Sequence, residues 1–150
     1  MTTEKHRKLL RAVQAEHAAI DAVMADIAQR LRAHDTGLST AEAGAQLEEE
    51  LESLRTRLDR HFRAEEGLDL NAILLELLPT ATAEVERLEA DHAAVRRLLG
   101  RVRAPPASLR AGRLSELRKA TALLFEVLRA HETSENELIE RALRVVDDAS

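Results

Sequence analysis

Apolar residues recur along most of the chain at alternating steps of three and four, the spacing of a helix with one buried face. Segments containing glycine or proline interrupt this pattern around residues 35–39, 67–79 and 104–108. Thr40, or Ser39 just before it, is the expected N-cap after the first interruption. The pattern predicts four helices, over residues 4–34, 40–66, 81–103 and 110–147.

Short connections between such long helices favour antiparallel neighbours. We therefore predict an all-α fold, an antiparallel up-down-up-down four-helix bundle that forms a single domain over residues 1–150. The sequence EHAAI at residues 16–20 is echoed by DHAAV at residues 91–95, which suggests a duplicated helical hairpin. The dominant residues are Ala, Leu, Arg and Glu, all of which favour helices.

Polar residues occupy a few core positions in these otherwise apolar helices. Besides Thr121, they are His17, His61, Glu65, His92, His131 and Glu135. A buried carboxylate without a partner is strongly destabilising, so glutamates aimed at one core require compensating charge. Imidazole nitrogens and carboxylate oxygens are both ligands of metal cations. The pattern therefore predicts a centre with two metal ions, and the alternative is a hydrogen-bonded His–Glu network without metal.

The spacing of these residues agrees with one shared site. Glu65 follows His61 by four residues and Glu135 follows His131 by four, so each pair lies on one helix face. Counted from the predicted loops, the first three helices bring their polar residues to nearly the same level. His92 and His131 lie at the same level along the bundle axis only if the fourth helix begins late or extends beyond the bundle.

Other histidines and carboxylates near this register have simpler interpretations. His6 and His34 are expected at helix ends or in loops, too far along the axis to share the site. Asp21 lies off the core register and is expected at the boundary or in solvent. The remaining carboxylates are expected to be solvated, with Glu66 or Glu132 able to hydrogen-bond a ligand residue: Glu16, Glu66, Asp91, Glu132 and Glu137.

Composition narrows the range of partners. The net charge is −5, the basic residues form no stripe, and two phenylalanines are the only aromatic residues, so we expect no nucleic acid. No apolar run approaches the roughly 20 residues of a membrane helix, and no secretory signal is evident, so we expect no membrane and a cytoplasmic location. The absence of cysteine excludes disulfides, thiolate zinc sites and a cysteine nucleophile.

With these motifs the sequence resembles the hemerythrin-like family of His-His-Glu cation-binding domains over nearly its whole length. The motifs are His17, HFRAE at residues 61–65, His92, and HETSE at residues 131–135. The resemblance implies two iron ions bridged by oxo or hydroxo and by both glutamates. It also implies one iron on His17 and His61 and the other on His92 and His131. Manganese and zinc accept the same ligands.

The chain departs from the oxygen-carrying hemerythrins of marine worms, which have a fifth histidine on the third helix. Leu88 and Arg96 flank His92 here. Those carriers also end with a His-x-x-x-x-Asp motif, whereas this chain has Glu135 at the fourth position and Asn136 at the fifth. Bacterial relatives with four histidines and two glutamates are more similar. Among them, the proteins that repair iron centres typically carry a cysteine-containing domain, which this chain lacks. These departures argue against reversible oxygen transport and against repair.

The function expected from this set of ligands is a non-haem di-iron protein that binds or senses O2 or NO. Each iron would keep one open position inside an apolar cavity. The alternatives are a di-iron enzyme that turns over peroxide or NO, and a protein for iron storage or donation. A structural zinc site fits poorly, because six nitrogen and oxygen ligands exceed the usual four. The chain has no tyrosine or tryptophan to carry a radical, which argues against a ribonucleotide-reductase-like role.

Overall fold

The computed structural model describes residues 3–35, 41–67, 70–102 and 111–149, and these form five α-helices without a strand. The helices are α1 (Thr3–Asp35), α2 (Ala41–Gly67), α3 (Leu70–Leu77), α4 (Thr82–Arg101) and α5 (Ala111–Asp148). The all-α prediction is confirmed, and each of the four predicted helices has a counterpart with bounds within two residues. The expected N-cap at residues 39–40 lies outside the described residues.

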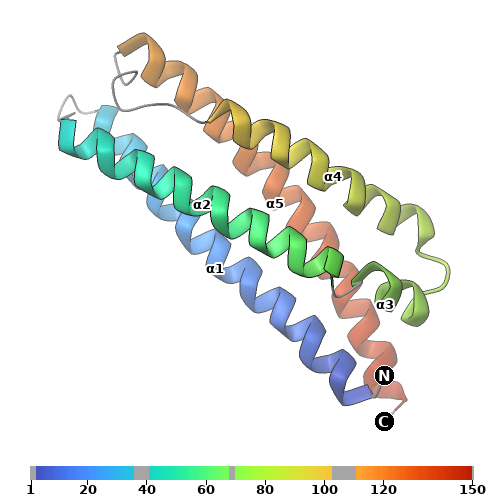
Figure 1. Cartoon of the computed structure of the whole chain (residues 1–150). Helices are drawn as coiled ribbons and strands as arrows, with labels where there is room; N and C mark the ends of the chain where they lie inside the picture. Colours follow the sequence, from blue (N-terminus) through green and yellow to red (C-terminus); the bar gives the residue numbers. More distant parts are fainter. Residues whose placement is uncertain (1–2, 36–40, 68–69, 103–110, 150) are drawn as a thin grey trace.

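The four long helices lie side by side as a bundle, with α3 folded against one end (Figure 1). The direction of the chain reverses from α1 to α2 and again from α4 to α5, and the two termini lie at the same end. α1 packs against α2 and α5, while α4 packs against α5 and α2. As a result, α2 and α5 face each other across the bundle. No described helix combines the length and the apolar run that crossing a membrane requires.

Two apolar clusters fill the bundle, one on each side of a polar layer. The larger cluster has members from all four long helices, among them Ile20, Leu54, Val95 and Leu128. The smaller cluster lies toward α3, and α1 contributes Leu10 and Val13 to it. His17 sits between Val13 of the smaller cluster and Ile20 of the larger one in the α1 series. The polar core residues therefore occupy a layer with packed hydrocarbon on both sides.

The short helix α3 was not predicted, because the sequence between the bracketing glycine and proline was interpreted as a break. Its side chains Leu70, Ile73 and Leu74 are buried. Leu70 and Leu74 belong to the smaller cluster, together with α4 and α5 residues. Helix α3 therefore covers the smaller apolar cluster at that end of the bundle.

The last turns of α5 differ from the predicted register. Continued along α5 through Leu138 and Ala142, the spacing of three and four places Val145 in the core, but Val145 is 38 % exposed, whereas Val146 is 2 % exposed. Ile139 and Leu143, off the predicted series, are also buried. Helix α3 packs against α5 in this region, so the buried face of α5 is wider than one bundle stripe. The same spacing places Leu68 and Leu114 in the core, but Leu68 and the side chain of Leu114 lie outside the described residues.

The sequence predicts a mismatch in level between His92 on the third helix and His131 on the fourth, and the greater length of the fourth helix accommodates it. α5 has 38 residues and α4 has 20. In Figure 1 the beginning of α5 extends past the end of α4. The late position of His131 in its helix therefore still brings it level with His92.

Truncation of the larger cluster should be costly. Leu54 is fully buried in that cluster, so Leu54→Ala removes packed hydrocarbon and leaves a cavity. We expect the free energy of unfolding to fall by about 2–5 kcal/mol in urea denaturation. The matched control is Leu123→Ala, because Leu123 is 43 % exposed and should change stability by less than ~0.5 kcal/mol. Equal effects of the two substitutions would contradict the described core.

Candidate metal centre

The six residues predicted as ligands come together in the polar layer. Each of them is between 1 % and 6 % exposed. α1 provides His17, α2 provides His61 and Glu65, α4 provides His92, and α5 provides His131 and Glu135. These positions fall in the apolar series of their helices, so the packing that buries leucines elsewhere also turns these side chains inward.

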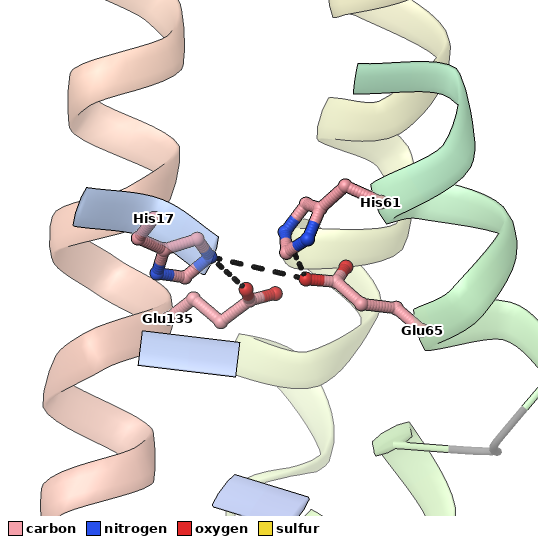
Figure 2. Close-up of side chains that lie close together, drawn as sticks. All are labelled: His17, His61, Glu65 and Glu135. Carbon is pink, nitrogen blue, oxygen red and sulfur yellow. Dashed lines mark ion pairs between the residues drawn. The ribbon is translucent and has the colours of Figure 1, made fainter. Parts of the chain in front are cut away.

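One half of the layer is formed by His17 and His61 with the two glutamates (Figure 2). His61 Nε2 lies 2.7 Å from Glu65 Oε1, and His17 Nε2 lies 2.8 Å from Glu135 Oε1. His17 Nε2 is also 3.9 Å from Glu65 Oε1. Two imidazole nitrogens and two carboxylate oxygens thus converge within 4.8 Å of one another, as the ligands of a single ion do.

The other half is formed by His92 and His131 with the same two glutamates. His92 Nε2 lies 3.0 Å from Glu65 Oε2, and His131 Nε2 lies 3.6 Å from Glu135 Oε2. Glu65 therefore faces one half with Oε1 and the other half with Oε2, and Glu135 does the same. This grouping is the one that the family resemblance implies, with both carboxylates placed to bridge.

The outer nitrogens of three of these histidines are held by side chains on neighbouring helices. His17 Nδ1 lies 2.8 Å from Asn136 Oδ1, and His131 Nδ1 lies 3.0 Å from Asp91 Oδ2. His92 Nδ1 lies 3.3 Å from Glu66 Oε1. Because all three partners are oxygen acceptors, the Nδ1 atom must donate its proton to them. In a neutral ring, this leaves Nε2 with a lone pair that points into the centre.

This arrangement tests whether the residues suit a metal. None of the four Nε2 atoms has a hydrogen-bond partner with good geometry, and neither do Glu65 Oε1 and Glu135 Oε1. Lone pairs on nitrogen therefore face anionic oxygens at short range, in a buried layer. Two sets of acceptors repel each other unless protons or cations lie between them. The donor set thus suits cations that prefer nitrogen and oxygen ligands.

Comparison with known proteins agrees with this geometry. The family model described as "Hemerythrin HHE cation binding domain" matches residues 8–143. The chain belongs to the hemerythrin family. No curated protein and no solved structure matches the chain. Membership of the hemerythrin family implies binding of metal cations, and the buried His–Glu groups are compatible with it. The assignment of the six individual ligands stays a prediction.

Without metal, protons must compensate the charges of this hemerythrin centre. Burial alone lowers the pKa of His17, but its contacts with Glu135 and Glu65 outweigh burial and raise that pKa to about 10. Burial raises the pKa of Glu65, but contacts with His17, His61 and His92 hold it well below the usual range. Burial and the nearby charge of Glu65 raise the pKa of Glu135. One glutamate is thus ionised beside an imidazolium, and a cation entering the site must displace protons.

Glu132 corrects one expectation from the sequence. It was expected to be solvated, yet it is 5 % exposed. Burial, and to a lesser extent a hydrogen bond with Asp21, raises the pKa of Glu132 to about 8. Asp21 itself is exposed, as expected. Glu132 is therefore a neutral acid next to the centre at neutral pH, and its partner reaches solvent.

Other flanking residues divide between expected and unexpected positions. Glu66 accepts a hydrogen bond from the predicted ligand His92, as the sequence analysis expected of either Glu66 or Glu132. Asp91 was interpreted as a surface carboxylate but holds His131. Glu137 is exposed. His6 lies near Glu76 of α3, with 3.9 Å between His6 Nε2 and Glu76 Oε2. His6 is nevertheless buried. The side chain of His34 lies outside the described residues.

Phe62 is a component of the centre that the sequence analysis did not identify. It is fully buried, and its ring stacks on His92 with centroids 4.1 Å apart. Its ring also meets the edges of His131 at 6.0 Å. Arg96 lies over Phe62 at 5.5 Å and hydrogen-bonds Glu66. The available signal was its rarity, since the chain contains two phenylalanines.

The residue that holds His131 should control metal affinity. Asp91→Ala removes the acceptor at His131 Nδ1, so the ring loses its fixed orientation and tautomer. We expect the metal ion on the His92 and His131 side to bind roughly 10- to 100-fold less tightly in a Co²⁺ titration against a chelator. Glu86→Ala, an exposed position on the same helix, is the matched control. Unchanged affinity in Asp91→Ala would refute the role of this contact.

Glu132 predicts a dependence of stability on pH in the metal-free protein. The folded chain keeps the proton up to a pKa of about 8, while the unfolded chain loses it near 4.5. Stability therefore falls as pH rises from about 4.5 to about 8. Glu132→Gln removes this cost and keeps a donor for Asp21.

We expect Glu132→Gln in the presence of chelator to raise the unfolding midpoint by roughly a few degrees at pH 8.5 and by little at pH 4.5. The control is Glu137→Gln, since Glu137 is exposed. The same increase at both pH values would mean that the buried proton is not the cause.

Proposed function

We propose that this hemerythrin domain is a non-haem di-iron protein that binds or senses O2 or NO at its four-His, two-Glu centre. The observation that carries the proposal is the sharing of Glu65 and Glu135 by both donor groups. Such sharing is what two ions with bridging carboxylates need, and it exceeds what one four-coordinate structural zinc ion uses.

The donor count supports a small ligand. Each half supplies two imidazole nitrogens and one oxygen from each glutamate, which is fewer than the six ligands that iron commonly takes. When bound, a pair of iron ions would supply a redox-active centre with room for a diatomic molecule. The protein's part is to orient the imidazoles through Asn136, Glu66 and Asp91.

The surroundings of the centre favour binding of an uncharged or weakly polar molecule. Apolar clusters lie on both sides of the polar layer. Phe62 covers His92 from within the larger cluster. A gas such as O2 or NO partitions readily into hydrocarbon, whereas ions pay for the loss of water. The apolar surroundings of the centre thus favour a small uncharged gas over an ion, which supports the proposed function.

Elemental analysis and rapid mixing test this function. We expect two irons per chain, and a change in the visible spectrum when the reduced protein meets O2 or NO. Glu65→Ala should lose both irons and the spectral change, because Glu65 belongs to both halves, whereas Glu137→Gln should retain them. A protein with two irons that shows no change with either gas would refute the proposal. Rapid evolution of oxygen from peroxide, lost in Glu135→Ala, would instead favour the enzymatic alternative.

A further inference from the structure

A pocket of about 270 Å³ lies in the groove between α1 and α2 and reaches the metal centre. α1 lines it with residues spaced as one helix face, Leu9, Ala12, Val13 and Glu16. α2 lines it in the same way, with Arg57, Arg60, His61, Ala64 and Glu65. Leu70, the first residue of α3, also lines it. The small side chains of Ala12 and Ala64, one on each helix, leave the space that larger residues would fill.

The lining changes in character from the surface to the interior. Arg60 is exposed, and the side chains of Arg57 and Glu16 are each 39 % exposed, so these three form the rim. Val13 and Leu70 are buried and form apolar wall. His61 and Glu65 are both 6 % exposed and form the floor. A molecule in this pocket would therefore extend from solvent to two of the predicted metal ligands.

The charge of the rim and the apolar wall set the orientation of an occupant. Arg57 and Glu16 form an ion pair at 3.7 Å, and Arg60 has no ion pair with a described residue, so the rim keeps one positive charge. An anionic group is thus attracted to the rim, and an apolar chain suits the buried wall of Val13 and Leu70 beneath it.

His61 differs from the other three histidines of the centre. The Nδ1 atoms of those three are each held by a side chain from another helix. For His61, no hydrogen bond at Nδ1 to a described residue is found, and its ring forms part of the pocket floor. The side of His61 that faces away from the centre therefore adjoins the pocket instead of a supporting residue.

We propose that this pocket binds a medium-chain organic carboxylate, with its carboxylate at Arg57 and Arg60 and its chain directed toward His61. The volume corresponds to roughly nine water molecules, which suits a chain of about eight to ten heavy atoms and far exceeds a diatomic gas. Apolar walls with a few charged groups at one end are typical of small-molecule sites. The site would place an organic molecule against a ligand of the metal centre, beyond the binding of a gas.

Calorimetric titration of the zinc-loaded protein with octanoate tests this proposal. Zinc fills the centre without redox chemistry, so the result does not depend on whether the iron form binds O2 or NO. We expect saturable binding of octanoate, and at least tenfold weaker binding of octanol, which lacks the charge, and of acetate, which lacks the chain.

Two variants locate the site. Arg57→Gln combined with Arg60→Gln should weaken octanoate binding at least tenfold through loss of the rim charge. Ala64→Phe should do the same by filling the pocket, and Ala64 is exposed, so the fold should tolerate the change. The matched control is Arg63→Gln, because the Arg63 side chain is 75 % exposed and pairs with Asp59 away from the pocket.

Unchanged octanoate binding in Arg63→Gln, together with the two losses, supports the proposal. It is overturned by absence of saturable octanoate binding, by octanol binding as tightly as octanoate, or by affinity unchanged in both pocket variants. Circular dichroism of each variant, with the same helix content and unfolding midpoint as the parent, ensures that a loss reflects the pocket.

Discussion

Two ionised or ionisable glutamates buried between hydrocarbon layers dominate the energetics of this protein. Glu65 and Glu135 lie with apolar clusters on both sides. A buried carboxylate is tolerated only when cations or donors surround it. Here the nearest groups are imidazoles, and three of them donate Nδ1–H to a side chain, so that Nε2 faces the glutamates. Apolar packing alone therefore does not stabilise this core. The charges of the glutamates must be balanced by protons or by metal ions, and the hemerythrin family's cation binding agrees with the second.

The surroundings of the centre show how a helical bundle fixes such a site. Every supporting contact joins two helices: α1 to α5 through His17 and Asn136, α4 to α5 through Asp91 and His131, and α2 to α4 through Glu66 and His92. These contacts require each helix to have the correct rotation as well as the correct position. Phe62 adds a rigid surface against which His92 packs. Orientation of the imidazoles is thus a property of the whole bundle.

Much of the fold and of the candidate site could be predicted from periodicity alone. A histidine or glutamate in an apolar series points inward, because its neighbours one turn away do. This rule correctly predicted that all six residues of the centre are buried. Periodicity could not find Glu132 or Phe62, which are buried because a neighbouring helix covers a position beside the main stripe. It also missed α3 and the exposure of Val145, since both depend on how α3 packs against α5. Contacts such as Asp91 with His131 depend on the relative rotation of two helices, which no single helix encodes.

The two glutamates come from α2 and α5, the helices that face each other across the bundle, while His17 and His92 come from the other opposed pair, α1 and α4. At this level of the bundle, leucine side chains do not determine how far apart the opposed helices stand. If these six residues bind metal as proposed, coordination distances along both diagonals would set that spacing. The centre would then act as a cross-brace, so that a small change in its bond lengths would move all four long helices together.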